Sequence, residues 1–127
     1  MNCIESPNGM KNPVLWKKRQ SIRDFIKQKP MFNQLMQQSK TCMRLHPELR
    51  NDVKGAIACE TIHPLTLTPF NNFTFHTHPH NIPYPSETDK NTTKKLKKEY
   101  LLIGVVPQQK VYAFHVKDNF EKAVSVF

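Results

Sequence analysis

The sequence from residue 73 to 89 reads Phe73-Thr-Phe75-His76-Thr-His78-Pro79-His-Asn-Ile-Pro-Tyr-Pro-Ser86-Glu-Thr-Asp89. Its first six residues alternate in a way typical of a β-strand, in which residues i and i+2 point to the same face, so His76 and His78 can converge on one ion. A helix is expected from about Glu87 to Lys98, and its first turn can supply Asp89 as a third, oxygen ligand. Two imidazoles and one carboxylate leave the fourth position of a zinc ion open for water, as in catalytic sites.

The spacing H-x-H-P-x6-S-x-x-D, formed by His76, His78, Pro79, Ser86 and Asp89, resembles the JAMM motif of the MPN+ zinc metalloproteases. These are isopeptidases that release ubiquitin-like modifiers from their targets. A His-x-His pair also occurs in amidohydrolases and polymerase-associated phosphoesterases. Those enzymes need a (β/α) barrel of typically ~250 residues. At 127 residues, this chain is too short for such a barrel.

The resemblance implies a role for each residue of the motif. His76, His78 and Asp89 would hold Zn²⁺, which lowers the pKa of a bound water from ~9 to ~7. Ser86 would help to stabilise the oxyanion of the tetrahedral intermediate. Ser86-x-x-Asp89 is also close to a capping box, and a capped helix start would fix Asp89 rigidly.

The family also uses a glutamate as general base, at the start of an earlier strand. The matching segment here is Asp52-Val-Lys-Gly55-Ala-Ile-Ala-Cys59, which places Asp52 in register with that glutamate. Aspartate is one methylene shorter, and misplacing a catalytic group by ~1 Å can cost ~100-fold in rate. The substitution therefore leaves the activity in question.

A predicted strand over Val53 to Thr61 allows three carboxylates to be ranked. If its turn to the strand at 73–78 centres near Leu65 to Leu67, antiparallel pairing places His78 opposite positions 52 to 56. Asp52 then fits best as the base. Glu48, after His46-Pro47, could swing in from a loop, and Glu60 would face the far end of the hairpin. Besides Asp52 and Glu48, the possibility remains open that the protein has no functional base.

The remaining elements predict an α+β domain. A short helix is expected from Trp16 to Gln28, with a strand near Arg23 to Ile26 as the alternative. A second helix should begin at Pro30 and end before Pro47, and residues 101–106 and 111–116 should form a hairpin. We therefore expect a single small MPN-like domain over residues 30–127, a mixed β-sheet flanked by helices, preceded by an arm or helix over residues 1–29.

Composition bears on the compartment and the binding partners of the protein. No apolar run approaches the ~20 residues needed to span a bilayer, and no signal peptide is evident. The three cysteines are scattered, which predicts free, partly buried thiols and a cytoplasmic, reducing compartment. The net charge of +9 suggests an acidic partner, whereas nucleic acid is not expected, because basic residues are not interleaved with aromatic ones.

The predicted function is that of a minimal zinc-dependent protease or isopeptidase. Its substrate would be an extended protein tail, such as the C-terminus of a ubiquitin-like modifier or of a precursor. The alternative is a catalytically weak or inactive MPN scaffold domain in a complex, which the missing glutamate supports. Structural or loop roles are expected for the histidines outside the motif, which are His46, His63, His80 and His115.

Overall fold

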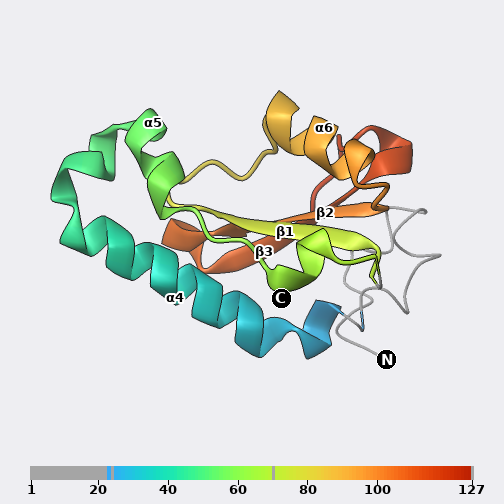
Figure 1. Ribbon diagram of the computed structural model, residues 1–127, viewed down its shortest axis with the longest axis horizontal. Coiled ribbons are helices and arrows are strands. Elements are labelled where there is room, and N and C mark those ends of the chain that lie inside the picture. The colour runs from blue at the N-terminus through green and yellow to red at the C-terminus, as the bar shows by residue number, and fades with distance from the viewer. Residues whose placement is uncertain (1–22, 24, 70, 127) are drawn as a thin grey trace.

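The computed structural model describes residues 23, 25–69 and 71–126 (Figure 1). Its helices and strands are, in chain order, α4 (Lys29–Leu45), α5 (Val53–Ala56), β1 (Phe73–His78), α6 (Glu87–Lys95), β2 (Tyr100–Val105), β3 (Lys110–His115) and β4 (Val124–Ser125). Short 3-10 turns lie between them. The predicted α+β class is confirmed.

The strands form one mixed sheet in the order β1-β2-β3-β4. β1 and β2 are parallel, with His76 opposite Ile103 and His78 opposite Val105. β2 and β3 form the predicted antiparallel hairpin, and β4 pairs with β3. Because β1 and β2 are parallel, α6 carries the chain from the end of β1 back to the start of β2.

Helix α4 covers one face of the sheet (Figure 1). Pro30 occupies its first turn, and its buried residues recur at helical spacing, as Phe32, Leu35, Met36 and Ser39. The contact with the sheet is close at Gly104, where a Cβ would lie 2.9 Å from Phe75 Cζ and 3.0 Å from Met36 Cγ. Only glycine gives α4 this approach to β2.

Strand β2 is buried along its whole length and divides the core in two. Phe73, Phe75 and Leu102 belong to the cluster under α4. The alternate residues of β2, Leu101, Ile103 and Val105, form a second cluster with Phe114 and Phe120. On β1, Thr74 points away from α4, and its hydroxyl lies 2.9 Å from that of Thr93 on α6. His76 and His78 share this face with Thr74, so they point toward α6.

The predicted strand over Val53 to Thr61 is wrong. This segment is α5 followed by a 3-10 turn, Ile57–Cys59. The Asp52 side chain caps α5 by accepting from Gly55 N at 3.1 Å, and a short apolar run does not distinguish helix from strand. The predicted hairpin with residues 73–78 is reduced to an isolated antiparallel bridge between Ile62 and His76, so it does not place Asp52.

The prediction of free thiols is wrong for two of the three cysteines. Cys42, in the last turn of α4, is disulfide-bonded to Cys59, with a Cα–Cα distance of 5.6 Å. The scattered spacing suggested no pair, because the fold brings the two residues together. Disulfides persist in oxidising environments, so the cysteines no longer favour a reducing compartment.

The predicted N-terminal helix lies mostly outside the described residues. Residues 25–27 are helical, which excludes the alternative strand there. Phe25 is fully buried and packs with the α4 cluster, so this residue belongs to the core of the domain. The predicted helix from Glu87 ends at Lys95, three residues earlier than expected. In the part of the chain that the structure describes, no helix is both long and apolar enough to cross a membrane.

Candidate metal centre

The three predicted metal ligands converge. His76 Nε2 lies 3.1 Å and His78 Nε2 3.2 Å from Asp89 Oδ2, and the two ring nitrogens are 2.9 Å apart. All three side chains are largely buried, with exposed fractions of 11% to 17%. The strand supplies both histidines from one face, and the first turn of α6 supplies the carboxylate.

The start of α6 fixes the position of Asp89. Ser86 Oγ accepts from Asp89 N at 3.1 Å, while Asp89 Oδ2 accepts from Ser86 N at 2.9 Å. This is the capping box that the sequence suggested, and it is complete. The carboxylate oxygen that caps the helix is the same atom that faces both histidines, so helix capping orients the ligand.

A backbone carbonyl fixes the orientation of His78. Its Nδ1–H donates to the carbonyl oxygen of Ile82 at 2.7 Å. Nε2 therefore carries the lone pair that a metal needs, and the ring cannot turn without losing this bond. The loop between β1 and α6 thus supplies the hydrogen-bond acceptor that orients His78, and this acceptor could not be predicted from the sequence.

The electrostatics of the three ligands are strongly coupled. Burial opposes ionisation of Asp89, but hydrogen bonds from His76, His78 and the Ser86 N–H outweigh it and hold the pKa of Asp89 far below its usual range. Burial lowers the pKa of His78, but hydrogen bonds to Asp89 and Ile82 outweigh it and raise that pKa overall. Without a metal, Asp89 thus stays ionised, and its negative charge favours a proton on His78 or a cation at this point.

These three groups fit a zinc ion. A tetrahedral zinc with bonds near 2.05 Å separates its ligand atoms by roughly 3.3 Å. The observed separations of 2.9 to 3.2 Å are only slightly shorter. The nitrogen and oxygen donors are also those that zinc accepts, which makes the group a candidate cation site.

Glu60 joins the site, although the sequence ranked it last. Ile62 forms an antiparallel bridge with His76, and Thr77 N donates to Thr61 O at 3.0 Å. Continuing this pairing by one residue brings Glu60 opposite His78, on the face that both histidines share. Burial raises the pKa of Glu60, the charges of His76 and His78 lower it, and Asp89 raises it again, with a net increase.

Asp52 and Glu48 are not placed as predicted. Asp52 is exposed, and its carboxylate caps α5. Glu48 is exposed and lies 3.4 Å from His46 Nδ1. Neither residue lines the cavity that contains Glu60, His78, Ser86 and Asp89. The expected turn at residues 65–67 is followed by a further loop before β1. This loop shifts the antiparallel register by four to eight positions, so the residue opposite His78 is Glu60 and not one of residues 52 to 56.

A cavity of about 320 Å³ opens beside these polar groups, and we call it the metal cavity. Its polar lining consists of Glu60, His78, His80, Ser86 and Asp89. The rest of its lining is largely apolar and includes four exposed side chains, namely Val53, Ile57, Ile82 and Tyr84. Polar groups within an apolar wall are typical of a ligand site.

Two other histidines have the structural roles that we expected. His63 is buried; its Nδ1 accepts from Leu65 N, and its Nε2–H donates to Gln28 Oε1, each at 3.0 Å. His115 is buried and bonds Glu99 Oε2 through Nε2 at 2.8 Å. Neither lines the metal cavity.

Comparison of the chain with protein-family models, with curated proteins and with solved structures found no match. The resemblance to the JAMM family therefore rests on the sequence motif at residues 76–89 alone.

Proposed function

We propose that this protein is a zinc-dependent peptidase or isopeptidase of the JAMM type, with an MPN-like fold. The observation that carries the proposal is the convergence of His76, His78 and Asp89, with a second carboxyl group, that of Glu60, lining the same cavity as His78 and Asp89. Three ligands with an adjacent carboxylate match what metal-assisted hydrolysis requires. When bound, zinc supplies Lewis-acid chemistry, which acidifies water and polarises a carbonyl.

Glu60 is the general base in this proposal. Its carboxylate accepts a proton from the attacking water as the water oxygen bonds to the scissile carbonyl carbon. The same carboxyl then gives the proton to the leaving nitrogen as the C–N bond breaks. A partly buried carboxylate that lines the same cavity as His78 and Asp89 is suited to both halves of this transfer.

Ser86 stabilises the oxyanion. Its Oγ already accepts from Asp89 N, which orients the hydroxyl and leaves its own hydrogen available to donate. The apolar wall formed by Ile57, Ile82 and Tyr84 holds the substrate chain and excludes water, which strengthens every polar contact in the cavity. The substrate is an extended protein segment, such as the tail of a ubiquitin-like modifier or of a precursor.

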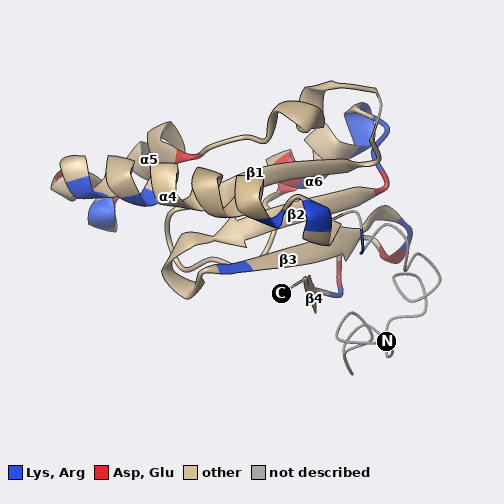
Figure 2. Cartoon of the chain, turned by 90° about the horizontal axis from the view of Figure 1, so that it is seen from below, with Lys and Arg blue, Asp and Glu red and all other residues tan. Residues whose placement is uncertain are grey.

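The competing proposal is a non-catalytic scaffold, and its support came from the absence of a glutamate in register. Glu60 supplies a carboxylate at the cavity, so this support is lost. The charge of +9 still allows an acidic partner. Figure 2 shows basic residues near α4 and α5 and again near α6, so in this view they do not follow one stripe of the kind that tracks nucleic acid.

Glu60→Gln tests the proposed function against matched controls. With zinc loaded, we expect kcat on a quenched-fluorescence peptide library to fall by ~10²- to 10⁴-fold, the usual contribution of a general base. Asp52→Asn, which preserves a side-chain cap, and Glu48→Gln should stay within a few-fold of the wild type. Full activity in Glu60→Gln, or loss confined to Asp52→Asn, would refute this assignment.

The metal is tested in the same assay. His76→Ala/His78→Ala should bind no zinc by elemental analysis and should have no activity. Hydrolysis that persists in this double variant would rule out the metal mechanism.

A further inference from the structure

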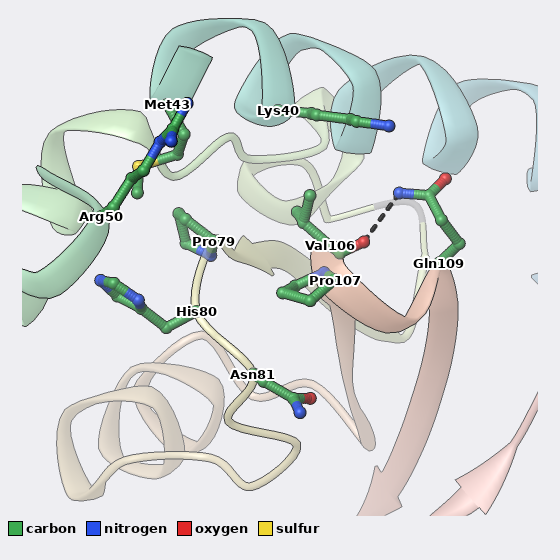
Figure 3. Close-up of a pocket in the computed structure, with 9 residues that line it drawn as sticks. All are labelled: Lys40, Met43, Arg50, Pro79, His80, Asn81, Val106, Pro107 and Gln109. Carbon is green, nitrogen blue, oxygen red and sulfur yellow. Dashed lines mark hydrogen bonds between the residues drawn. The ribbon is translucent and has the colours of Figure 1, made fainter. Parts of the chain in front are cut away.

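A second cavity, of about 370 Å³, adjoins the metal cavity, and we call it the basic cavity (Figure 3). It lies between the C-terminal half of α4, the chain after β1 and the turn after β2. Met43, Pro79, Val106 and Pro107 form apolar walls, and Lys40 and Arg50 also line it. None of its lining residues is acidic.

Two cations, Lys40 and Arg50, line the basic cavity. Lys40 and Arg50 are exposed, and neither has an ion-pair partner among the described residues. Most surface cations need no partner, but two at one concave, apolar site create a local positive potential. Arg50 can bind a carboxylate with two parallel hydrogen bonds, and Lys40 adds a point charge.

The sheet places this cavity next to the metal ligands. His78 pairs with Val105, so the parallel strands β1 and β2 end side by side, and their next residues, Pro79 and Val106, both line the basic cavity. Pro79 and His80 line the metal cavity as well. His80 Nε2 is buried and has no hydrogen-bond partner in the described part of the chain, which leaves a polar atom where the cavities adjoin.

We propose that the basic cavity binds a carboxylate of the substrate peptide, and that this carboxylate lies close to the bond that is hydrolysed. The proposal rests on the proposed function and adds a specificity to it. Because the two cavities share Pro79 and His80, an extended peptide that occupies the metal cavity can continue into the basic cavity. The apolar walls pack against the methylene stem of an Asp or Glu side chain. The side chains of Arg50 and Lys40 extend in different directions (Figure 3), so Arg50 binds the carboxylate and the charge of Lys40 adds to the positive potential of the cavity.

The binding test uses zinc-loaded Glu60→Gln, which should hold peptides without hydrolysing them. The probes are fluorescein-labelled decapeptides that carry Asp or Glu at one scanned position, each matched with its Asn or Gln counterpart. At one or two positions we expect the acidic peptide to bind at least ~10-fold more tightly, the size of a charge-assisted hydrogen bond. Equal affinity of acidic and amide peptides at every position would overturn the proposal.

The cavity is identified by two charge-matched variants. Lys40→Gln/Arg50→Gln should remove the acidic preference. Lys95→Gln/Lys122→Gln removes the same charge from exposed positions that do not line the cavity, and it should keep the preference. If both variants lower the preference for acidic peptides equally, this preference comes from the net charge of the protein, and the proposal fails. If a short oligonucleotide at equimolar concentration displaces the peptide from the wild type but not from Lys40→Gln/Arg50→Gln, the basic cavity is identified as a nucleic-acid site, and the proposal is overturned.

The failure of this proposal can be distinguished from that of the proposed function. Hydrolysis by the wild type without an acidic preference in kcat/KM would refute the basic cavity as a subsite and leave the peptidase intact. If zinc-loaded wild type hydrolyses no peptide in the library, the peptidase proposal fails, and the substrate subsite fails with it.

Discussion

The carboxylate of Asp89 has two roles at once, because one oxygen caps α6 and faces the two histidines of β1. A helix cap is normally a matter of stability alone. Here any change that loosens the cap also moves a metal ligand. Stability and metal affinity are therefore coupled at Ser86.

Ser86→Ala should lower the free energy of unfolding by about 1 kcal/mol, since alanine cannot cap the helix. Ser86→Asn should keep most of that stability, because asparagine caps helices as well as serine does. Urea unfolding of the metal-free proteins measures both values. An unchanged unfolding midpoint in Ser86→Ala would show that the cap contributes nothing to the fold.

His63 should make the stability of the protein dependent on pH. Burial lowers the pKa of His63 in the folded state, whereas the unfolded chain takes up the proton near its ordinary pKa of ~6.5. The unfolded state therefore binds more protons as the pH falls through ~6.5 toward the folded pKa, and stability is lost in that window.

His63→Gln removes this titration. Between pH 7.5 and 5.0, the loss in free energy of unfolding should be smaller in the variant than in the wild type, with zinc removed from both. Parallel curves for the two proteins would show that His63 does not titrate differently on folding.

Among the elements, the turn at Ile57–Cys59 is held by its covalent bond to α4. Cys59 precedes Glu60 directly, so the Cys42–Cys59 disulfide anchors the chain one residue before the proposed base. Closing a loop of this length stabilises a protein by about 3 kcal/mol in the chain-entropy model.

Reduction should therefore lower the urea midpoint of the wild type and also lower its kcat, because Glu60 loses its anchor. Cys42→Ser/Cys59→Ser should show the same lowered values with or without reductant. If reductant changes neither the urea midpoint nor the kcat of the wild type, this role for the disulfide is refuted.

The sequence predicted the elements whose apolar residues have a clear period. The stripe of α4, the alternation of β1 and the paired runs of β2 and β3 all appear close to their expected bounds. The segment after Asp52 has no such period, and a short run of Gly, Ala and Ile suits a helix or a strand equally. Its helical form depends on the Asp52 cap and on contacts that only the fold provides.

At the scale of the whole molecule, a metal would join elements that are otherwise connected by a loop. His76 and His78 belong to the sheet, and Asp89 belongs to α6. Zinc binds the folded arrangement, so at 100 times its dissociation constant it should raise the free energy of unfolding by about 2.7 kcal/mol.

Thermal unfolding with zinc and with a chelator measures this gain. It should vanish in His76→Ala/His78→Ala and persist in His46→Ala, since His46 is exposed and distant from the ligands in sequence. A gain of equal size in the double variant would show that zinc stabilises the protein from some other site.

The metal ligands could be predicted from sequence because they lie within fourteen residues, where strand and helix periods fix their faces. Glu60 could not, because its place depends on the length of the loop that joins it to β1. The turn at Pro64–Leu67 does not lead directly into β1, and Lys98, three residues after α6, donates to the carbonyls of Thr68 and Asn71 between the turn and the strand. A contact this distant in sequence leaves no local signal.

The end that β1 and β2 share separates the paired strands of the sheet from the loops that line both cavities. The ligand histidines and the core are held by paired strands, whereas residues 79–85 and 106–109 leave the sheet at the same edge and carry much of the lining of both cavities. Under the proposed function, exchanging these two loops would alter which peptides are accepted without repacking the interior. Grafting loops between β1 and α6 and between β2 and β3 would then be a way to engineer the cleavage preference of the proposed peptidase.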